Sequence, residues 1–129
     1  MPHLELDYAP ALEAHVDMQA LCRALCDELA VSGLFPPGAL RVRARPAHFI
    51  TLALGAEHGI CLDMVLRMLP GRPEADRRAL LAQLYETARR FVLAGTGDVP
   101  LALTLEIREI DPVNERSWNA LHTLFTDRR

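Results

Sequence analysis

The stretch ICLDMVLRML, residues 60–69, is the part of this 129-residue chain that indicates its fold class most clearly. Every second side chain is apolar, and the members of this set are Ile60, Leu62, Met64, Leu66 and Met68. Such alternation predicts a β-strand that buries one of its two faces. The segments on either side indicate which elements accompany this strand.

After this strand the apolar period changes to that of a helix. We expect a helix over residues 73–94, with acidic Glu74 and Asp76 in its first turn, where they favour the helix dipole. Its apolar stripe consists of Leu80, Leu81, Leu84, Ala88, Phe91 and Val92. Residues 101–110 alternate again and predict a second strand.

The first half of the chain follows the same plan. We expect a strand over residues 2–8, a helix over 17–32 and a strand over 40–45 that ends at Pro46. Residues 49–53 are expected to extend this last strand towards a hairpin at 55–59. A short helix over 116–125 closes the chain.

The order of these elements predicts an α+β fold made of a tandem β-α-β repeat in a single domain, residues 1–129. The halves are about 2–53 and 58–110, followed by a tail of 111–129. Right-handed crossovers place both helices on one face of a four-stranded mixed sheet. The other face is charged, with Glu5, Asp7, Arg41, Arg43, Arg45, Asp63, Arg67, Glu106 and Arg108, and is either solvated or packed against other subunits.

Composition limits the class of protein. With 14 basic and 17 acidic residues the formal net charge is −3, which makes nucleic acid a poor partner. No apolar run reaches about 18 residues, so we expect no membrane span. Without an export signal, the three cysteines are expected to be thiols in the cytoplasm. No His or Cys pair completes a metal site, and none is expected.

Pro2 is the first candidate for chemistry. It follows Met1, a context in which the initiator methionine is commonly removed, and removal leaves the proline nitrogen as a secondary amine. The pKa of an ordinary α-amino group is about 8. Burial or a nearby arginine lowers this pKa, so the neutral base is populated at pH 7. The alternative is that Pro2 only begins a strand.

Four arginines are candidates for binding anions. Arg41, Arg43 and Arg45 share one strand face, where guanidiniums about 7 Å apart repel unless anions intervene. The anions are either carboxylates of neighbouring strands, from Glu5, Asp7, Asp63 or Glu106, or a dicarboxylate ligand. Arg72 stands just before the second helix, whose N-terminus favours anions. The alternative for Arg72 is an ordinary surface arginine in a turn.

Taken in order, these motifs resemble the 5-carboxymethyl-2-hydroxymuconate isomerase family of the tautomerase superfamily. The resemblance spans residues 2–125. It rests on Met1-Pro2-His3 before the first strand, on Gly33-Leu34-Phe35-Pro36 leading to Arg41-Val42-Arg43-Ala44, on Pro70-Gly71-Arg72, on Leu101-Ala102-Leu103, and on Asn119-Ala120-Leu121-His122 in the tail.

The resemblance implies a homotrimer and a cofactor-free keto-enol tautomerisation of a 2-hydroxymuconate-type dienol acid during aromatic catabolism. The family's amino-terminal proline base corresponds to Pro2. Its substrate-binding arginines correspond to Arg41 and Arg72, with Arg43 assisting. Because only the first repeat begins with a free terminus, one base per chain is expected. The competing hypothesis is a non-catalytic trimeric module that binds a carboxylate or a protein with the same arginines.

Overall fold

The computed structural model describes residues 2–55 and 58–128 of the chain. Its strands and α-helices are β1 (His3–Tyr8), α1 (Met18–Val31), β2 (Arg41–Pro46), β3 (Ile60–Met68), α2 (Glu74–Thr96) and β4 (Leu101–Glu109). Short 3₁₀ helices cover Pro10–Ala14, Pro37–Ala39, Pro112–Asn114 and Leu121–Arg128. The order β-α-β, β-α-β agrees with the predicted tandem repeat.

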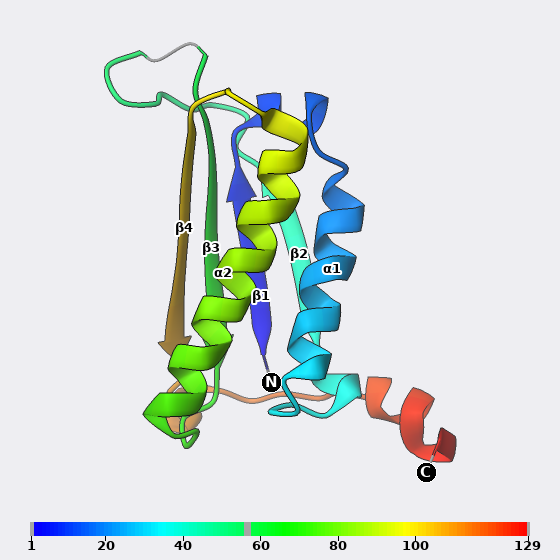
Figure 1. Ribbon diagram of the computed structural model, residues 1–129. Helices are drawn as coiled ribbons and strands as arrows, with labels where there is room; N and C mark the ends of the chain where they lie inside the picture. Colours follow the sequence, from blue (N-terminus) through cyan, green and yellow to red (C-terminus); the bar gives the residue numbers. More distant parts are fainter. Residues whose placement is uncertain (1, 56–57, 129) are drawn as a thin grey trace.

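The four strands form one mixed sheet in the order β2-β1-β3-β4. Strands β1 and β2 are parallel, β3 and β4 are parallel, and β1 and β3 at the centre are antiparallel. Both helices cover the same face of this sheet (Figure 1). The predicted α+β fold, with two helices on one face of a four-stranded sheet, is thereby confirmed.

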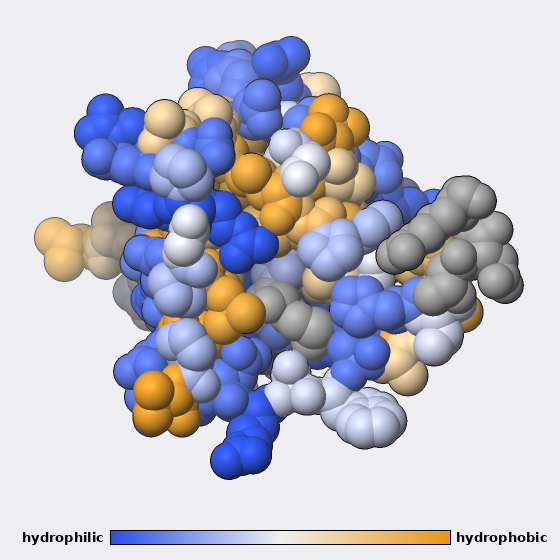
Figure 2. All heavy atoms as spheres, turned by 90° about the horizontal axis from the view of Figure 1, so that it is seen from below, coloured by the Kyte–Doolittle hydropathy of each residue, from blue (hydrophilic) through white to orange (hydrophobic). Residues whose placement is uncertain are grey.

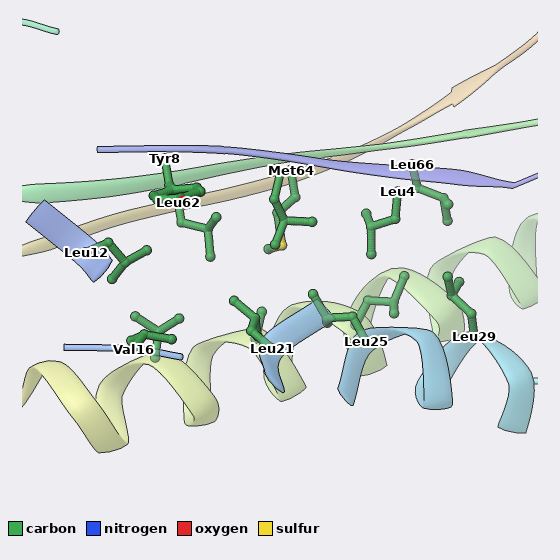
Figure 3. Packing of buried hydrophobic residues seen from close by; sticks show 14 of the residues in the cluster. Leu4, Tyr8, Leu12, Val16, Leu21, Leu25, Leu29, Leu62, Met64 and Leu66 are labelled. Atoms are coloured by element: carbon green, nitrogen blue, oxygen red, sulfur yellow. The ribbon is translucent and has the colours of Figure 1, made fainter. Parts of the chain in front are cut away.

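The core lies between the sheet and the two helices. Leu4 of β1 and Leu66 of β3 point from the sheet towards α1, whose Leu21, Leu25 and Leu29 point back at them (Figure 3). All five of these side chains are fully buried. The predicted apolar faces are therefore the buried faces, and the charged set of the strands lies on the open face of the sheet.

The helix ends follow from local chemistry. Asp17 caps α1 by accepting a hydrogen bond from the backbone nitrogen of Ala20 at 3.1 Å, and Gly33 follows the helix with a φ of 71°. Helix α2 runs two residues further than expected, to Thr96, and ends at Gly97 with a φ of 56°. Among the described residues, no helix is both long and apolar enough to cross a membrane.

The expected hairpin between the second and third strands is wrong. Strand β2 ends at Pro46, residues 49–53 are not a strand, and β1 lies between β2 and β3. Backbone hydrogen bonds from Ala47 to Tyr8 (2.8 Å) and from Ala9 to Cys61 (3.0 Å) show how β1 separates the two. The prediction was wrong because turn glycines indicate a chain reversal but do not specify which strands pair. The loop between β2 and β3 crosses the end of β1. Residues 56 and 57 lie outside the described residues.

The expected closing helix over 116–125 is also wrong in type and position. The tail forms a 3₁₀ helix over Leu121–Arg128, and residues 115–120 are not helical. Asn119 accounts for the late start, because its Oδ1 accepts from the backbone nitrogen of Leu121 at 2.9 Å. Its Nδ2 donates to the carbonyl of Gly38 at 2.8 Å, which attaches the tail to the Pro37–Ala39 turn.

Candidate active site

The topology brings the predicted site residues to one end of the sheet. Pro2 precedes β1, Arg41 is the first residue of β2, and Arg72 lies four residues after the end of β3. Because β3 is antiparallel to β1 and β2, its end lies beside their beginnings. In Figure 1 this is the lower end, where the N-terminus lies above the segment that leads from β4 to the tail.

Pro2 is buried at this end. Alternation along β1 places its ring on the same side as Leu4, which is fully buried against the helices. Seen from this end, hydrophobic and hydrophilic surfaces lie side by side (Figure 2). A nitrogen at this position has an apolar side, from the core, and a charged side, from the open face of the sheet.

Arg41 is directly across the ladder from His3, the residue after Pro2. Its side chain is partly exposed and forms no hydrogen bond or ion pair with the residues that the structure describes. A guanidinium has five N–H donors in a planar fork that matches a carboxylate. Arg41 is thus available to an anionic ligand.

Arg72 is held by the backbone of two loops. Its Nη2 donates to the carbonyl of Leu34 at 3.0 Å, and its Nη1 donates to the carbonyl of Leu69 at 3.3 Å. The guanidinium carbon lies 4.8 Å from the centre of the Phe35 ring. Arg72 therefore joins the α1–β2 loop to the β3–α2 loop, and its remaining N–H groups have no partner among the described residues.

Arg43 has a protein partner. It forms an ion pair with Glu5, its cross-strand neighbour, and Arg67 of β3 reaches the same Oε1 at 3.2 Å. The prediction that neighbouring carboxylates satisfy the arginine ladder is thus confirmed for Arg43. Arg45, at the far end of the ladder, makes no such pair with the described residues.

His3 is a residue that sequence reasoning did not place in the site. It is only 9% exposed, and its Nδ1 is buried without a hydrogen-bond partner among the described residues. Burial, followed by the positive charges of Arg67, Arg41 and Arg43, lowers its pKa below the usual 6.5. The imidazole is accordingly neutral at pH 7. Only the cross-strand register, which the sequence does not show, reveals that these cations surround it.

The C-terminal tail contacts the same end of the molecule. A Cβ added at Gly38 would lie 2.7 Å from the Cα of His122 and 2.7 Å from its Nδ1. Glycine is therefore required at position 38 for the 3₁₀ helix Leu121–Arg128 to pack on the Pro37–Ala39 turn. Gly38 precedes Arg41 by three residues, so the tail packs close to the start of β2.

Within the described residues, no three His, Cys, Asp or Glu side chains are grouped so that they could hold a metal ion. The cations at this end of the sheet instead point to an anion as the ligand. Guanidiniums in such a place are suited to orienting carboxylates and to stabilising negative charge that develops on them.

Known proteins resemble this chain over nearly its whole length. A curated relative, 5-carboxymethyl-2-hydroxymuconate Delta-isomerase of Escherichia coli, is 26% identical over 125 residues, which cover 97% of this chain and 99% of the relative. A crystal structure of 5-carboxymethyl-2-hydroxymuconate delta-isomerase superposes with a TM-score of 0.90 at 29% identity and covers 98% of this chain and 93% of its own.

Further structures extend the likeness. A 5-carboxymethyl-2-hydroxymuconate isomerase from Deinococcus radiodurans R1 superposes with a TM-score of 0.85 at 24% identity and covers 96% of this chain and 93% of its own. A fused 4-OT symmetric trimer shares the fold with a TM-score of 0.64 at 14% identity, covering 90% of this chain and 93% of its own.

The model of the family described as 5-carboxymethyl-2-hydroxymuconate isomerase matches residues 2–125. This match includes the four strands of the sheet and the two α-helices that pack on it. It also includes Pro2 and the four candidate arginines, Arg41, Arg43, Arg45 and Arg72. The chain therefore belongs to the 5-carboxymethyl-2-hydroxymuconate isomerase family of the tautomerase superfamily and is an isomerase.

Proposed function

We propose that this isomerase ketonises a 5-carboxymethyl-2-hydroxymuconate-like dienol carrying two or three carboxylates, without a cofactor, in aromatic catabolism in the cytoplasm. The observation that carries the proposal is the placement of a buried Pro2 next to His3, whose cross-strand partner Arg41 makes no hydrogen bond or ion pair with the described residues. The names of the relatives in this family support the substrate class.

Pro2 is the proposed base once Met1 has been removed. Its neutral nitrogen takes the proton of the enol hydroxyl, so that the O–H bond breaks and a dienolate forms. The electrons move along the conjugated chain as the carbonyl forms, and the Pro2 ammonium returns the proton to a carbon of that chain. The neutral form of an amine is the form that accepts a proton, and a buried position such as that of Pro2 favours neutral over charged groups.

The arginines bind and orient the substrate in this proposal. Arg41 holds one carboxylate in a bidentate manner, because its guanidinium has no protein partner among the described residues. Arg72 presents its remaining N–H groups to a second carboxylate while the two loop carbonyls and the Phe35 ring fix its orientation. Arg43 assists through the positive field of the strand, because Glu5 already occupies part of its fork.

We further propose that the chain acts as a homotrimer. Its outer strands β2 and β4 each pair with a strand on one side only, and edge strands of this kind favour further pairing. Phe49 and Leu54, in the loop between β2 and β3, are almost fully exposed. Apolar side chains in such a position favour contact with another copy. The fused 4-OT neighbour, which shares the fold, is a symmetric trimer.

The decisive experiment follows ketonisation of 2-hydroxymuconate and of its 5-carboxymethyl derivative by ultraviolet absorbance. Protein with a mass-verified free Pro2 is compared with a Pro2→Ala variant and with a form that retains Met1. Turnover by the first, with a loss of at least 100-fold in the other two, supports the proposal, since a general base contributes about 10²–10⁴ to the rate. Turnover by the form that retains Met1 excludes Pro2 as the base, because its nitrogen is then an amide.

A further inference from the structure

A second arginine, Arg77, contacts the turn that carries Arg72. It lies in the first turn of α2, which begins at the lower end of the sheet in Figure 1, where the candidate site residues gather. Its Nη1 donates to the carbonyl of Arg72 at 2.7 Å, and its backbone nitrogen donates to the carbonyl of Pro73 at 3.1 Å. Arg77 thus binds two successive carbonyls just before the helix.

The main chain of this turn has little other support. Residues 70–72 take part in no backbone–backbone hydrogen bond with the residues that the structure describes. Pro70 and Pro73 have no N–H to donate, and Pro73, which stands at the N-cap of α2, makes no side-chain capping bond. The contact from Arg77 is therefore the one hydrogen bond that the carbonyl of Arg72 accepts from the described part of the chain.

Arg77 makes this contact although carboxylates lie near it. Glu74, Glu106 and Glu109 line the same surface hollow as Arg77. Within the described ranges none of them forms an ion pair with it, because Glu74 pairs with Arg78 and Glu106 pairs with Arg108. A hydrogen bond from a charged donor is stronger than one between neutral groups. The side chain of Arg77 is thus directed at the turn.

Arg72 is consequently held at both ends. Its guanidinium is fixed by the carbonyls of Leu34 and Leu69 and by the ring of Phe35, and its main chain is fixed by Arg77. The rotatable bonds of the side chain connect these two fixed points. A group that is held in its binding geometry before the ligand arrives loses less conformational freedom on binding.

We propose that Arg77 is a positioning residue of this isomerase, which fixes the main chain of Arg72 so that its guanidinium is ready for a substrate carboxylate. This inference rests on the proposed function, because it takes Arg72 as a contact of the substrate. Arg77 does not touch the substrate in this proposal and acts through Arg72. When Arg77 is removed, the turn moves and Arg72 presents its remaining N–H groups correctly in only a fraction of the molecules.

The first test is a double-mutant cycle on the ketonisation of 2-hydroxymuconate. Arg77→Met keeps the length of the side chain and removes its donors, and it is expected to raise KM about tenfold while changing kcat by less than about threefold. Arg77→Lys restores a charged donor and is expected to recover part of this loss. In the background of Arg72→Gln, Arg77→Met is expected to change kcat/KM by less than about twofold, because the residue through which it acts is gone.

Two results of the cycle would overturn the proposal. The first is an equal factor for Arg77→Met in both backgrounds, which means that Arg77 acts independently of Arg72. The second is a fall in kcat with an unchanged KM, which indicates loss of folded protein instead of a misplaced Arg72. Circular dichroism selects a temperature at which every variant is folded.

Arg78→Met is the matched control. Arg78 is the next residue of the same helix, its side chain is exposed, and its ion pair in the described structure is with Glu74. This variant loses the same charge from α2 and is expected to leave KM within about twofold of the parent. A rise in KM equal to that of Arg77→Met would show that the charge of the helix matters and the contact with the turn does not.

A second readout does not depend on turnover. Nitrogen-15 NMR detects the guanidinium of Arg72, whose signals are identified by their absence in Arg72→Lys. Bonds to two carbonyls slow the rotation of this group, so its Nη1 and Nη2 are expected to give separate signals in the parent and in Arg78→Met, and merged signals in Arg77→Met. If the parent ketonises no dienol, the proposed function fails, and this measurement still decides the role of Arg77. Separate Nη signals in Arg77→Met would remove it.

Discussion

The substitution Arg72→Lys separates the structural role of this residue from its proposed role in binding. Lysine keeps the positive charge and reaches one of the two carbonyls, but it lacks the planar fork that contacts both and stacks on Phe35. The change removes one charge-assisted hydrogen bond, of about 1.5 kcal/mol, and a cation–π contact of about 0.5 kcal/mol. The expected fall in the free energy of unfolding is therefore about 2 kcal/mol.

For a chain of this length, a loss of about 2 kcal/mol corresponds to a fall in Tm of roughly 6–10 °C. Thermal unfolding followed by circular dichroism measures this shift. Arg78→Lys is the matched control, because Arg78 is exposed on α2 and its one ion pair within residues 2–55 and 58–128 is with Glu74 at 3.0 Å, a contact worth at most about 0.5 kcal/mol. The Tm of the control is expected to equal that of the parent. If the Tm of Arg72→Lys also equals it, the hydrogen bonds from Arg72 to the two loop carbonyls do not stabilise the fold. The reasoning from their distances is then refuted.

Three further predictions concern the tail, the buried histidine and the buried tyrosine. Gly38→Ala is expected to detach the 3₁₀ helix that contains His122 and to expose the chain after Glu115 to limited proteolysis, whereas an uncleaved variant would show that the turn can shift. His3 has a lowered pKa, so its neutral form stabilises the fold above about pH 6.5 and this contribution is lost as the pH falls. Urea unfolding at pH 7.5 and 5.5 is expected to show a smaller difference for His3→Gln than for the parent. Burial, followed by the hydrogen bond to Glu13, raises the pKa of Tyr8 to about 12, so the ultraviolet titration difference between the parent and Tyr8→Phe should have its midpoint there. A midpoint near 10 would argue against a buried hydroxyl.

The strands and helices could be predicted because their side chains carry local signals. Alternation at Leu4 and Leu6, and helical spacing at Leu21, Leu25 and Leu29, reflect which faces are buried. Burial on one face is a property of each element, so it is visible in the sequence of that element alone. The two β-α-β units followed directly.

Pairing between strands was not predictable in the same way. The hairpin expected at 55–59 was wrong because turn glycines are compatible with any partner strand. In the structure β1 pairs with both β2 and β3 and lies between them. The candidate site could be predicted only in part for the same reason. Pro2, Arg41 and Arg72 were expected from their residue types and positions and from the resemblance to a family. His3 and Arg67, which are 64 positions apart in the sequence, become neighbours only through the register between β1 and β3.

The antiparallel pairing of β1 and β3 determines what a divided version of this protein could do. Cutting the loop between Pro46 and Ile60 would give the second unit its own amino terminus. That new terminus would lie at the opposite end of the sheet, about 30 Å from Pro2 along the nine residues of β3. A second amine created in this way would need its own cations, and Arg45 of β2 is the arginine already present at that end. In the continuous chain the start of β3 instead follows the loop from Pro46, at the end of the sheet far from Pro2.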